Sequence, residues 1–204
     1  MNKQVVLSSH YFPCIAYFKL MLKHKYVVLD LGEYFIKQSY RNRCVIYTSN
    51  GCLALSVPVI RKNKTAVKEV VLDTSIDWKK SHWRAISSAY NSSPFFEFYK
   101  EDLKRVFFEN HKTLPELNIV LLNHICQEIG LTTNIVTSKR YVELSNLKVD
   151  CRNSLNAKKD FTEAINYPRY IQIFEEKHGY ISNLSILDLL FHEGPETLNY
   201  LKAL

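Results

Sequence analysis

The stretch "KQVVLSSHYFPCIAYFKLMLKHKYVVLD", residues 3–30, contains two short apolar runs separated by a segment with helical features. The first run, "KQVVLSS", and the last, "KYVVLD", predict strands. Pro13 lies where a helix can begin, and residues 11–24 are therefore predicted to contain a helix. Continuous apolar strands are typical of a sheet covered on both faces, and a right-handed crossover makes two such strands parallel. The stretch thus predicts a strand–helix–strand unit with parallel strands.

A hairpin is predicted next, because Asn50-Gly51 separates "RCVIYTS" at 43–49 from "LALSVPVI" at 53–60. This dipeptide readily adopts the positive φ angles of a tight turn, so the two runs are expected to pair antiparallel. "VKEVVLD" at 67–73 predicts a further strand. Pro58 indicates a sheet edge or the end of a strand, because proline has no backbone N–H to donate.

The remaining sequence is mainly helical in pattern. Helices are predicted over 77–90, 95–108 and 114–130, followed by a strand over 133–138. Residues 139–168 are polar and irregular, which fits either a long functional loop or a weak domain boundary. "RYIQIF" at 169–174 predicts a last strand, and residues 182–204 predict one helix to Glu193, a Gly-Pro break and a short terminal helix.

These elements predict a single domain over residues 1–204. We expect an α/β fold with a mixed, partly parallel sheet, an antiparallel hairpin, flanking helices and a more helical C-terminal half. With 47% hydrophobic residues, the chain of 204 residues can bury a full core.

The composition favours a cytoplasmic protein with an anionic partner. The formal net charge is +7, which suits a nucleotide-sugar, an acyl carrier, an acidic lipid or nucleic acid. No run of five or more basic residues is present, so we do not expect nucleic-acid binding. Apolar runs such as "ILDLLF" are too short for a membrane span, and the N-terminus lacks the pattern of a secretory signal.

No metal or cofactor is expected. The five cysteines form no CxxC pair, and the seven histidines show no HxH or HExxH spacing. The chain also lacks GxGxxG and GxxxxGK[ST], the glycine-rich motifs that bind dinucleotides and nucleoside triphosphates.

The stretch "YFIKQSYRNRCVI", residues 34–46, mixes cations with aromatic rings. If residues 35–43 are extended, alternation places Lys37, Arg41 and Arg43 on one face of the strand. Such a row is suited to phosphate or carboxylate, because an Arg fork takes two oxygens and Lys adds a mobile charge. The alternative is a solvated strand edge whose charges prevent aggregation.

Two other residues in the first half are candidates for catalysis. Asp30 ends an apolar strand, where ligands of parallel sheets gather, and it is either a base, a partner that orients Lys37 or Arg43, or a cap of the following turn. His82 falls on the apolar face of its predicted helix. It is either a core histidine or a general base that titrates near neutral pH.

The C-terminal segment "SILDLLFH" places Ser185, Asp188 and His192 on one helical face. This order does not form a catalytic triad, because the histidine must lie between the serine and the acid. A buried Asp188 needs a partner, and we expect one of the cations of residues 34–46 to supply it, either as a structural pair or as a wall of the site. Ser185 is a candidate helix cap, as is Asn183.

Several motifs in this order resemble the WbqC-like family, whose members are encoded among genes for O-antigen and other bacterial surface polysaccharides. The resemblance spans nearly the whole chain and includes the acidic strand end at Asp30. Its motifs are "YFPCIAYFKLM" (11–21), "IKQSYRNRCVI" (36–46), "LSVPV" (55–59), "DWKKSHW" (77–83), "AYNSSPFF" (89–96), "YIQIF" (170–174) and "NLSILDLLFHEG" (183–194). The chain departs from the family pattern in two places: Ser9-His10 stands where many members have Gln-Pro, and His192 where another polar residue is common.

The resemblance implies an enzyme that transfers an acyl or aminoacyl group, such as glycyl, to an amino sugar. The alternative is a non-catalytic module of the same pathway that binds a sugar, a nucleotide-sugar or a protein partner. We expect a small phosphorylated or nucleotide-linked sugar as the ligand. The candidate catalytic residues are His82, Asp30 and Asp188, and the candidate substrate-binding residues are Lys37, Arg41, Arg43, Asn42, Tyr17 and Ser185.

Overall fold

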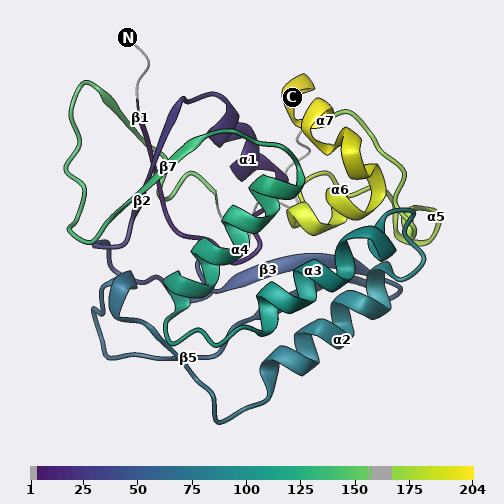
Figure 1. Ribbon diagram of the computed structural model, residues 1–204, viewed down its shortest axis with the longest axis horizontal. Helices are drawn as coiled ribbons and strands as arrows, with labels where there is room; N and C mark the ends of the chain where they lie inside the picture. Colours follow the sequence, from purple (N-terminus) through teal and green to yellow (C-terminus); the bar gives the residue numbers. More distant parts are fainter. Residues whose placement is uncertain (1–3, 156, 158–166) are drawn as a thin grey trace.

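The computed structural model describes residues 4–155, 157 and 167–204. Its main sheet has four parallel strands in the order β7-β2-β1-β8. The two central strands are β1 (Gln4–Leu7) and β2 (Tyr26–Asp30), joined through helix α1 (Ile15–Leu22). The predicted strand–helix–strand unit is therefore confirmed (Figure 1). The edge strands are β7 (Asn134–Ser138) and β8 (Lys148–Asp150).

The predicted hairpin is also present. Strands β3 (Arg43–Thr48) and β4 (Gly51–Ser56) pair antiparallel, and Gly51 has a φ of +95° at the turn. Two shorter strands, β5 (Val59–Ile60) and β6 (Val71–Leu72), form a separate antiparallel pair. The strand predicted over 67–73 is thus only partly correct, because it begins as the 3-10 helix η1 (Val67–Glu69).

Helices α2 (Trp78–Tyr90), α3 (Phe96–Phe108) and α4 (Leu114–Glu128) follow as predicted. A capping box in which Thr113 and Glu116 satisfy each other's backbone N–H groups starts α4. The C-terminal part contains α5 (Glu175–His178), α6 (Ile186–Glu193), the 3-10 helix η2 (Gly194–Glu196) and α7 (Thr197–Ala203). The expected fold class, a mixed α/β structure with a more helical C-terminal half, is confirmed (Figure 1).

Two sequence predictions need correction. The irregular segment 139–168 contains β8, which pairs in parallel with β1; residues 156 and 158–166 of that segment lie outside the described part. The stretch 169–174 is irregular rather than a strand. The side chain of Gln172 bonds to the backbone of Ile181 instead. Gln172 Nε2 donates to the Ile181 carbonyl at 2.8 Å, and Ile181 N donates to Gln172 Oε1 at 3.0 Å. The prediction of one domain over residues 1–204 remains a prediction.

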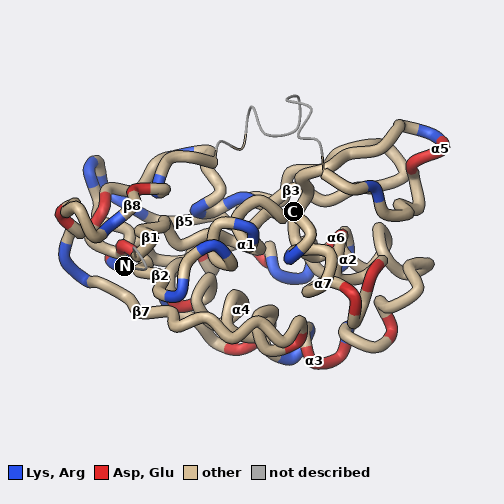
Figure 2. The backbone as a smooth tube through the Cα atoms, turned by 90° about the horizontal axis from the view of Figure 1, so that it is seen from above, with Lys and Arg blue, Asp and Glu red and all other residues tan. Residues whose placement is uncertain are grey.

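The core joins the sheet to the helices. Fully buried side chains from β1, α1, α4 and α6, including Leu7, Phe18, Leu121 and Phe191, belong to one hydrophobic cluster. In Figure 2 acidic residues concentrate around α3 and the neighbouring helices, whereas basic residues are frequent near β1, β2, β5 and β8. The basic part of the molecule therefore includes the main sheet and the segments beside it.

The loop after β2 has a tightly defined path. Gly32 lies against the backbone of Arg140 and Tyr141, where even a Cβ atom would clash. Because the strands are parallel, β1, β2 and β8 end at one edge of the sheet, and Ser8, Leu31 and Cys151 follow there. This edge is where ligands bind in many parallel α/β sheets.

Candidate anion-binding site

A cavity of about 630 Å³ lies between the loop after β2, the hairpin and the segment after β5. Four cations line it: Lys37, Arg43, Arg61 and Lys62. None of the described residues that line it is acidic. We call this cavity the anion pocket, because four positive charges with no carboxylate among the described lining residues favour a negatively charged ligand.

The hairpin and the preceding loop create the anion pocket. Antiparallel pairing places Arg43 opposite Ser56, and Arg43 Nε donates to Ser56 Oγ at 3.0 Å. Asn42 is fixed by two hydrogen bonds with Val57, through its side chain at 2.9 Å and its backbone carbonyl at 2.8 Å. These bonds hold the pocket wall in one arrangement.

Arg61 is held by an aromatic ring on the other wall. Its guanidinium lies 5.4 Å from the centroid of the Phe35 ring, which is within the range of a cation–π contact. Phe35 itself is 9% exposed. A mostly buried ring under a guanidinium positions the cation and leaves its N–H groups for other partners.

The prediction of extended backbone over residues 35–43 is wrong. Residues 37–42 form turns, and Gln38 has a φ of +54°, a left-handed conformation that is uncommon for residues other than glycine. The chain therefore does not alternate, and the three cations do not share a face. Lys37 and Arg43 line the anion pocket, whereas Arg41 turns into the protein.

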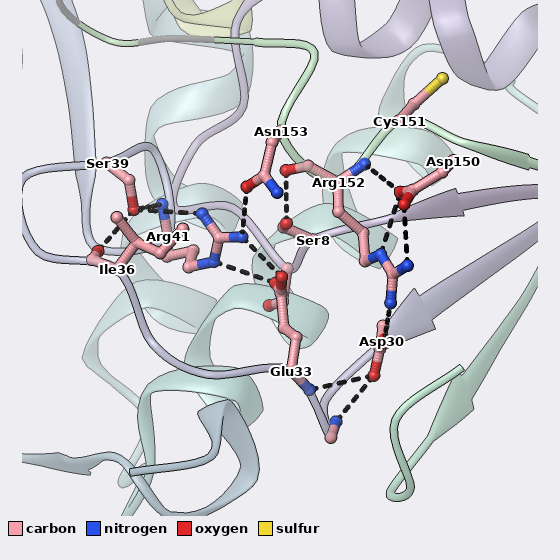
Figure 3. Close-up of polar contacts among 12 residues, drawn as sticks. Ser8, Asp30, Glu33, Ile36, Ser39, Arg41, Asp150, Cys151, Arg152 and Asn153 are labelled. Carbon is pink, nitrogen blue, oxygen red and sulfur yellow. Dashed lines mark hydrogen bonds and ion pairs between the residues drawn. The ribbon is translucent and has the colours of Figure 1, made fainter. Parts of the chain in front are cut away.

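Arg41 forms a buried ion pair with Glu33 (Figure 3). Arg41 Nε donates to Glu33 Oε1 at 2.9 Å, and Nη2 donates to Oε2 at 2.6 Å. Nη2 also donates to Asn153 Oδ1 at 3.2 Å. The side chains of Arg41 and Glu33 are only 3% and 7% exposed. Paired in this bidentate way, the Arg41 charge is already compensated.

Asp30 occupies the centre of a second buried network at the same sheet edge (Figure 3). Its Oδ1 accepts from the backbone N–H groups of Gly32 and Glu33, at 2.9 and 3.1 Å. Its Oδ2 accepts from Val142 N at 3.0 Å and from Arg152 Nη1 at 2.6 Å. With four hydrogen bonds and no exposed surface, Asp30 caps the turn after β2. It does not line the anion pocket.

Arg152 connects the loops after β2 and β8. Besides Asp30, it donates to both carboxylate oxygens of Asp150, at 2.9 and 2.8 Å. These bonds lower the pKa of Asp150 below its ordinary value. Ser8 Oγ donates to the Arg152 carbonyl at 2.7 Å and so ties the end of β1 to the same network. Arg152 and Glu33 were not predicted as site residues.

Comparison with known proteins identifies the family. The model of the "WbqC-like protein family" matches residues 8–159, which include every described residue that lines the anion pocket. The chain belongs to the WbqC-like family. An "Uncharacterized protein Rv1507c" of Mycobacterium tuberculosis is 30% identical over 230 residues, covering 99% of this chain and 98% of that protein. No solved structure matches the chain.

In this WbqC-like protein His82 is a core residue. It is 7% exposed, its Nδ1 lies 2.9 Å from the Tyr11 hydroxyl, and its ring meets the Trp78 ring edge-on. Burial lowers the pKa of His82 to about 4, against a weaker opposing effect of a hydrogen bond to the Ser56 backbone. His82 is therefore neutral at pH 7. It does not line the anion pocket, although Ser56 does.

Asp188 lies in a separate buried cluster in the C-terminal part. Its Oδ2 accepts from the Tyr170 hydroxyl at 2.6 Å and from Gln172 Nε2 at 3.0 Å. The expected partner from residues 34–46 is therefore wrong, and among the described residues the side chain of His192 lies beside this carboxylate, with Nδ1 3.9 Å from Asp188 Oδ2. Burial raises the pKa of Asp188 above its ordinary value. The cluster also lies beyond the residues that the family model matches.

The two remaining predicted binding residues have buried hydroxyl groups. Tyr17 is fully buried and donates to the Ser8 carbonyl at 2.8 Å. Ser185 donates to the Phe12 carbonyl at 3.0 Å and accepts from Leu187 N at 3.4 Å, as the predicted cap of α6. Of the predicted binding residues, the structure brings Lys37, Asn42 and Arg43 together at the anion pocket. Tyr17, Arg41 and Ser185 have structural partners instead.

The structure adds Arg61 and Lys62 to the pocket. The available signal was the basic segment "RKNK" directly after the second hairpin run, because hairpin pairing returns the chain beside Arg43. Within the described residues, no group of His, Cys, Asp or Glu is arranged to hold a metal ion. No described helix has the length and apolar character needed to cross a membrane.

Proposed function

We propose that this protein binds a phosphorylated or nucleotide-linked sugar through the anion pocket and acts in bacterial surface-polysaccharide biosynthesis. Family membership suggests the association with polysaccharides. The observation that carries the proposal is the convergence of Lys37, Arg43, Arg61 and Lys62 on one cavity. A diphosphate is a suitable ligand, because two Arg forks and two Lys ammonium groups can bind several oxygens at once.

The size of the anion pocket supports a small-molecule ligand. Its volume of about 630 Å³ falls within the range of about 300–1,000 Å³ that is typical of small-molecule sites. The Arg43–Ser56 and Arg61–Phe35 contacts already position both guanidinium groups. A preformed site loses less conformational entropy on binding, so these contacts favour affinity.

The proposed reaction is transfer of an acyl or aminoacyl group to the amine of a nucleotide-linked amino sugar. The amine nitrogen forms a bond to the acyl carbon, the bond between that carbon and the donor breaks, and a base takes the amine proton. His82, Asp30 and Asp188 were the predicted catalytic residues; all three are buried and hydrogen-bonded, and none of them lines the anion pocket. The geometry therefore supports binding, and the support for transfer comes from the family resemblance.

Calorimetric titration of the full chain with inorganic pyrophosphate and with UDP-, dTDP- and GDP-linked amino sugars tests the binding proposal. Lys37→Ala and Arg43→Ala should each raise Kd about tenfold, since a charged hydrogen bond contributes roughly 1.5–3 kcal/mol. Lys104→Ala removes an exposed cation on α3 and should leave Kd unchanged. Equal Kd values for the wild type and both pocket variants would exclude the anion pocket as the site.

A second experiment separates the transferase from the non-catalytic binding module. The protein is incubated with nucleotide-linked amino sugars and candidate acyl or aminoacyl donors, and mass spectrometry detects an acylated sugar. The transferase predicts product that decreases in Lys37→Ala and Arg43→Ala. A binding module predicts the same Kd changes with no product from any donor.

A further inference from the structure

A second cavity adjoins the anion pocket. It has a volume of about 370 Å³ and is lined by Ile36, Lys37, Gln38, Arg41, Asn153 and Leu155, among others. Lys37 and Gln38 line both cavities. The two spaces therefore meet at the turn after β2, and one extended ligand can contact both.

The chemistry of the second cavity differs from that of the anion pocket. Its one guanidinium, on Arg41, is compensated by the bidentate pair with Glu33. Lys37, which both cavities share, is its other cation, and the remaining polar groups among the described lining residues are neutral: the amides of Gln38 and Asn153 and the hydroxyl of Ser39. Ile36 and Leu155 add apolar surface. Neutral hydrogen-bonding groups beside aliphatic carbon suit a sugar ring, which presents hydroxyl groups on a carbon frame.

The second cavity also lies where the fold places ligands. Its walls come from the loop after β2 and from the loop after β8, at the carboxyl ends of the two strands that flank β1 in the parallel sheet. Figure 3 shows Arg41 and Asn153, one from each loop, pointing toward each other. Asn118 Nδ2 donates to the Arg41 carbonyl at 2.8 Å and fixes the first of these loops from α4.

Gln38 stands at the junction in an unfavourable backbone conformation. Its φ of +54° costs roughly 1 kcal/mol or more for a residue with a Cβ atom. The turn is held nonetheless, because Ser39 Oγ donates to the Ile36 carbonyl at 2.7 Å and Tyr11 N donates to the Tyr40 carbonyl at 2.9 Å. The side chain between the two cavities is thereby kept in place.

We infer that the two cavities form one bipartite site, in which the anion pocket holds phosphate and the cavity beside Arg41 holds the attached sugar. This inference rests on the proposed function and specifies the orientation of its substrate. Lys37 would contact the bridging phosphate, and Gln38 and Asn153 would bond to sugar hydroxyl or acetamido groups. The reactive amine would then lie at the carboxyl edge of the parallel sheet.

The test compares inorganic phosphate with N-acetylglucosamine 1-phosphate, because the difference in their Kd values reports the sugar. Wild type should bind the sugar phosphate about tenfold more tightly, equivalent to about 1.4 kcal/mol. Leu155→Trp fills the second cavity, and Asn153→Leu removes an exposed amide that accepts from Arg41 Nη2, while the Arg41–Glu33 pair keeps its two hydrogen bonds. In both variants the ratio of the Kd of phosphate to the Kd of the sugar phosphate should fall to near one, while the Kd of phosphate stays unchanged. Leu144→Trp changes a side chain that is 53% exposed outside both cavities and should keep the ratio.

The outcomes separate this inference from the proposed function. A wild-type ratio near one, or an undiminished ratio in both Leu155→Trp and Asn153→Leu, would overturn the bipartite site and leave phosphate binding intact. Phosphate binding that is absent, or that is unaffected by Lys37→Ala and Arg43→Ala, would overturn the proposed function and this inference with it.

Discussion

Arg41 and Glu33 form a bidentate ion pair, with Arg41 Nη2 2.6 Å from Glu33 Oε2 and both side chains almost fully buried. The pair connects the turn after β2 to the segment that leads into the hairpin. It thereby holds the wall that the two cavities share. Arg41 thus stabilises this wall and lines the second cavity, while Arg43, two residues later, lines the anion pocket.

Removing one partner of this pair should destabilise the protein strongly. Arg41→Ala leaves the Glu33 carboxylate buried without its counter-charge, and we expect a loss of about 3–5 kcal/mol in the free energy of unfolding. Arg43→Ala is the matched control and should cost less than about 1 kcal/mol, because its side chain is partly solvated. Urea denaturation at pH 7 measures both. Similar values for the two variants would contradict the structural role assigned to Arg41.

Burial of His82 should make stability depend on pH. Because its pKa is lowered to about 4 in the folded state from an ordinary 6.5, the unfolded chain binds more protons between these values. Stability should therefore fall as pH decreases from about 6.5 toward 4, by on the order of 3 kcal/mol from this group. His10, whose pKa burial also lowers, adds to the decrease.

His82→Gln isolates the contribution of His82. Glutamine can still accept a hydrogen bond from Tyr11 but does not titrate, so the variant should lose less stability than wild type between pH 7 and pH 5. Urea denaturation at the two pH values gives the difference. If wild type and variant lose equal free energy of unfolding between pH 7 and pH 5, His82 is not protonated on unfolding in this range.

The pH dependence of stability that Asp188 contributes should have the opposite sign to that of His82. Its pKa is raised by burial, so the stability associated with its protonated form is greatest below about pH 3.8 and is lost as pH rises through the folded-state pKa. Asp188→Asn keeps an acceptor for Tyr170 and Gln172 and removes the charge. We expect it to stabilise the protein by about 1 kcal/mol at pH 7 and by less at pH 4.

Asp188→Leu serves as the matched variant. It removes the acceptor along with the charge and leaves the Tyr170 and Gln172 donors unsatisfied, so we expect a loss of about 2 kcal/mol at pH 7. Thermal unfolding at pH 7 and at pH 4 ranks the stability of the wild type and the two variants. A destabilised Asp188→Asn at pH 7 would indicate that the ionised carboxylate is required, and that the cluster favours the charged form.

The sequence predicted the elements whose signals are local. The apolar runs around Val5 and Val27 and the Asn50-Gly51 turn each determine their structure within a few residues. Strand β8 was missed because its three residues, Lys148–Asp150, include two charged side chains and pair with β1, far away in the sequence. Such an edge strand depends on its partner rather than on its own propensity.

The candidate site was predicted only in part, for a similar reason. Lys37 and Arg43 were identified together with Arg41 from an extended strand that does not exist, and Asn42 was a candidate through the family resemblance. Alternation could not show that Gln38 turns the chain or that Arg41 meets Glu33, since both depend on packing against other segments. The burial of His82 and Asp30 was among the alternatives that the pattern left open.

The most direct test of phosphate binding in the anion pocket is a crystal structure of the protein with inorganic pyrophosphate or a nucleotide-linked amino sugar. We predict phosphate oxygens about 2.7–3.0 Å from the guanidinium nitrogens of Arg43 and Arg61, with Lys37 or Lys62 completing the contacts. Density for the diphosphate at another surface, with these four cations solvated, would contradict the central claim.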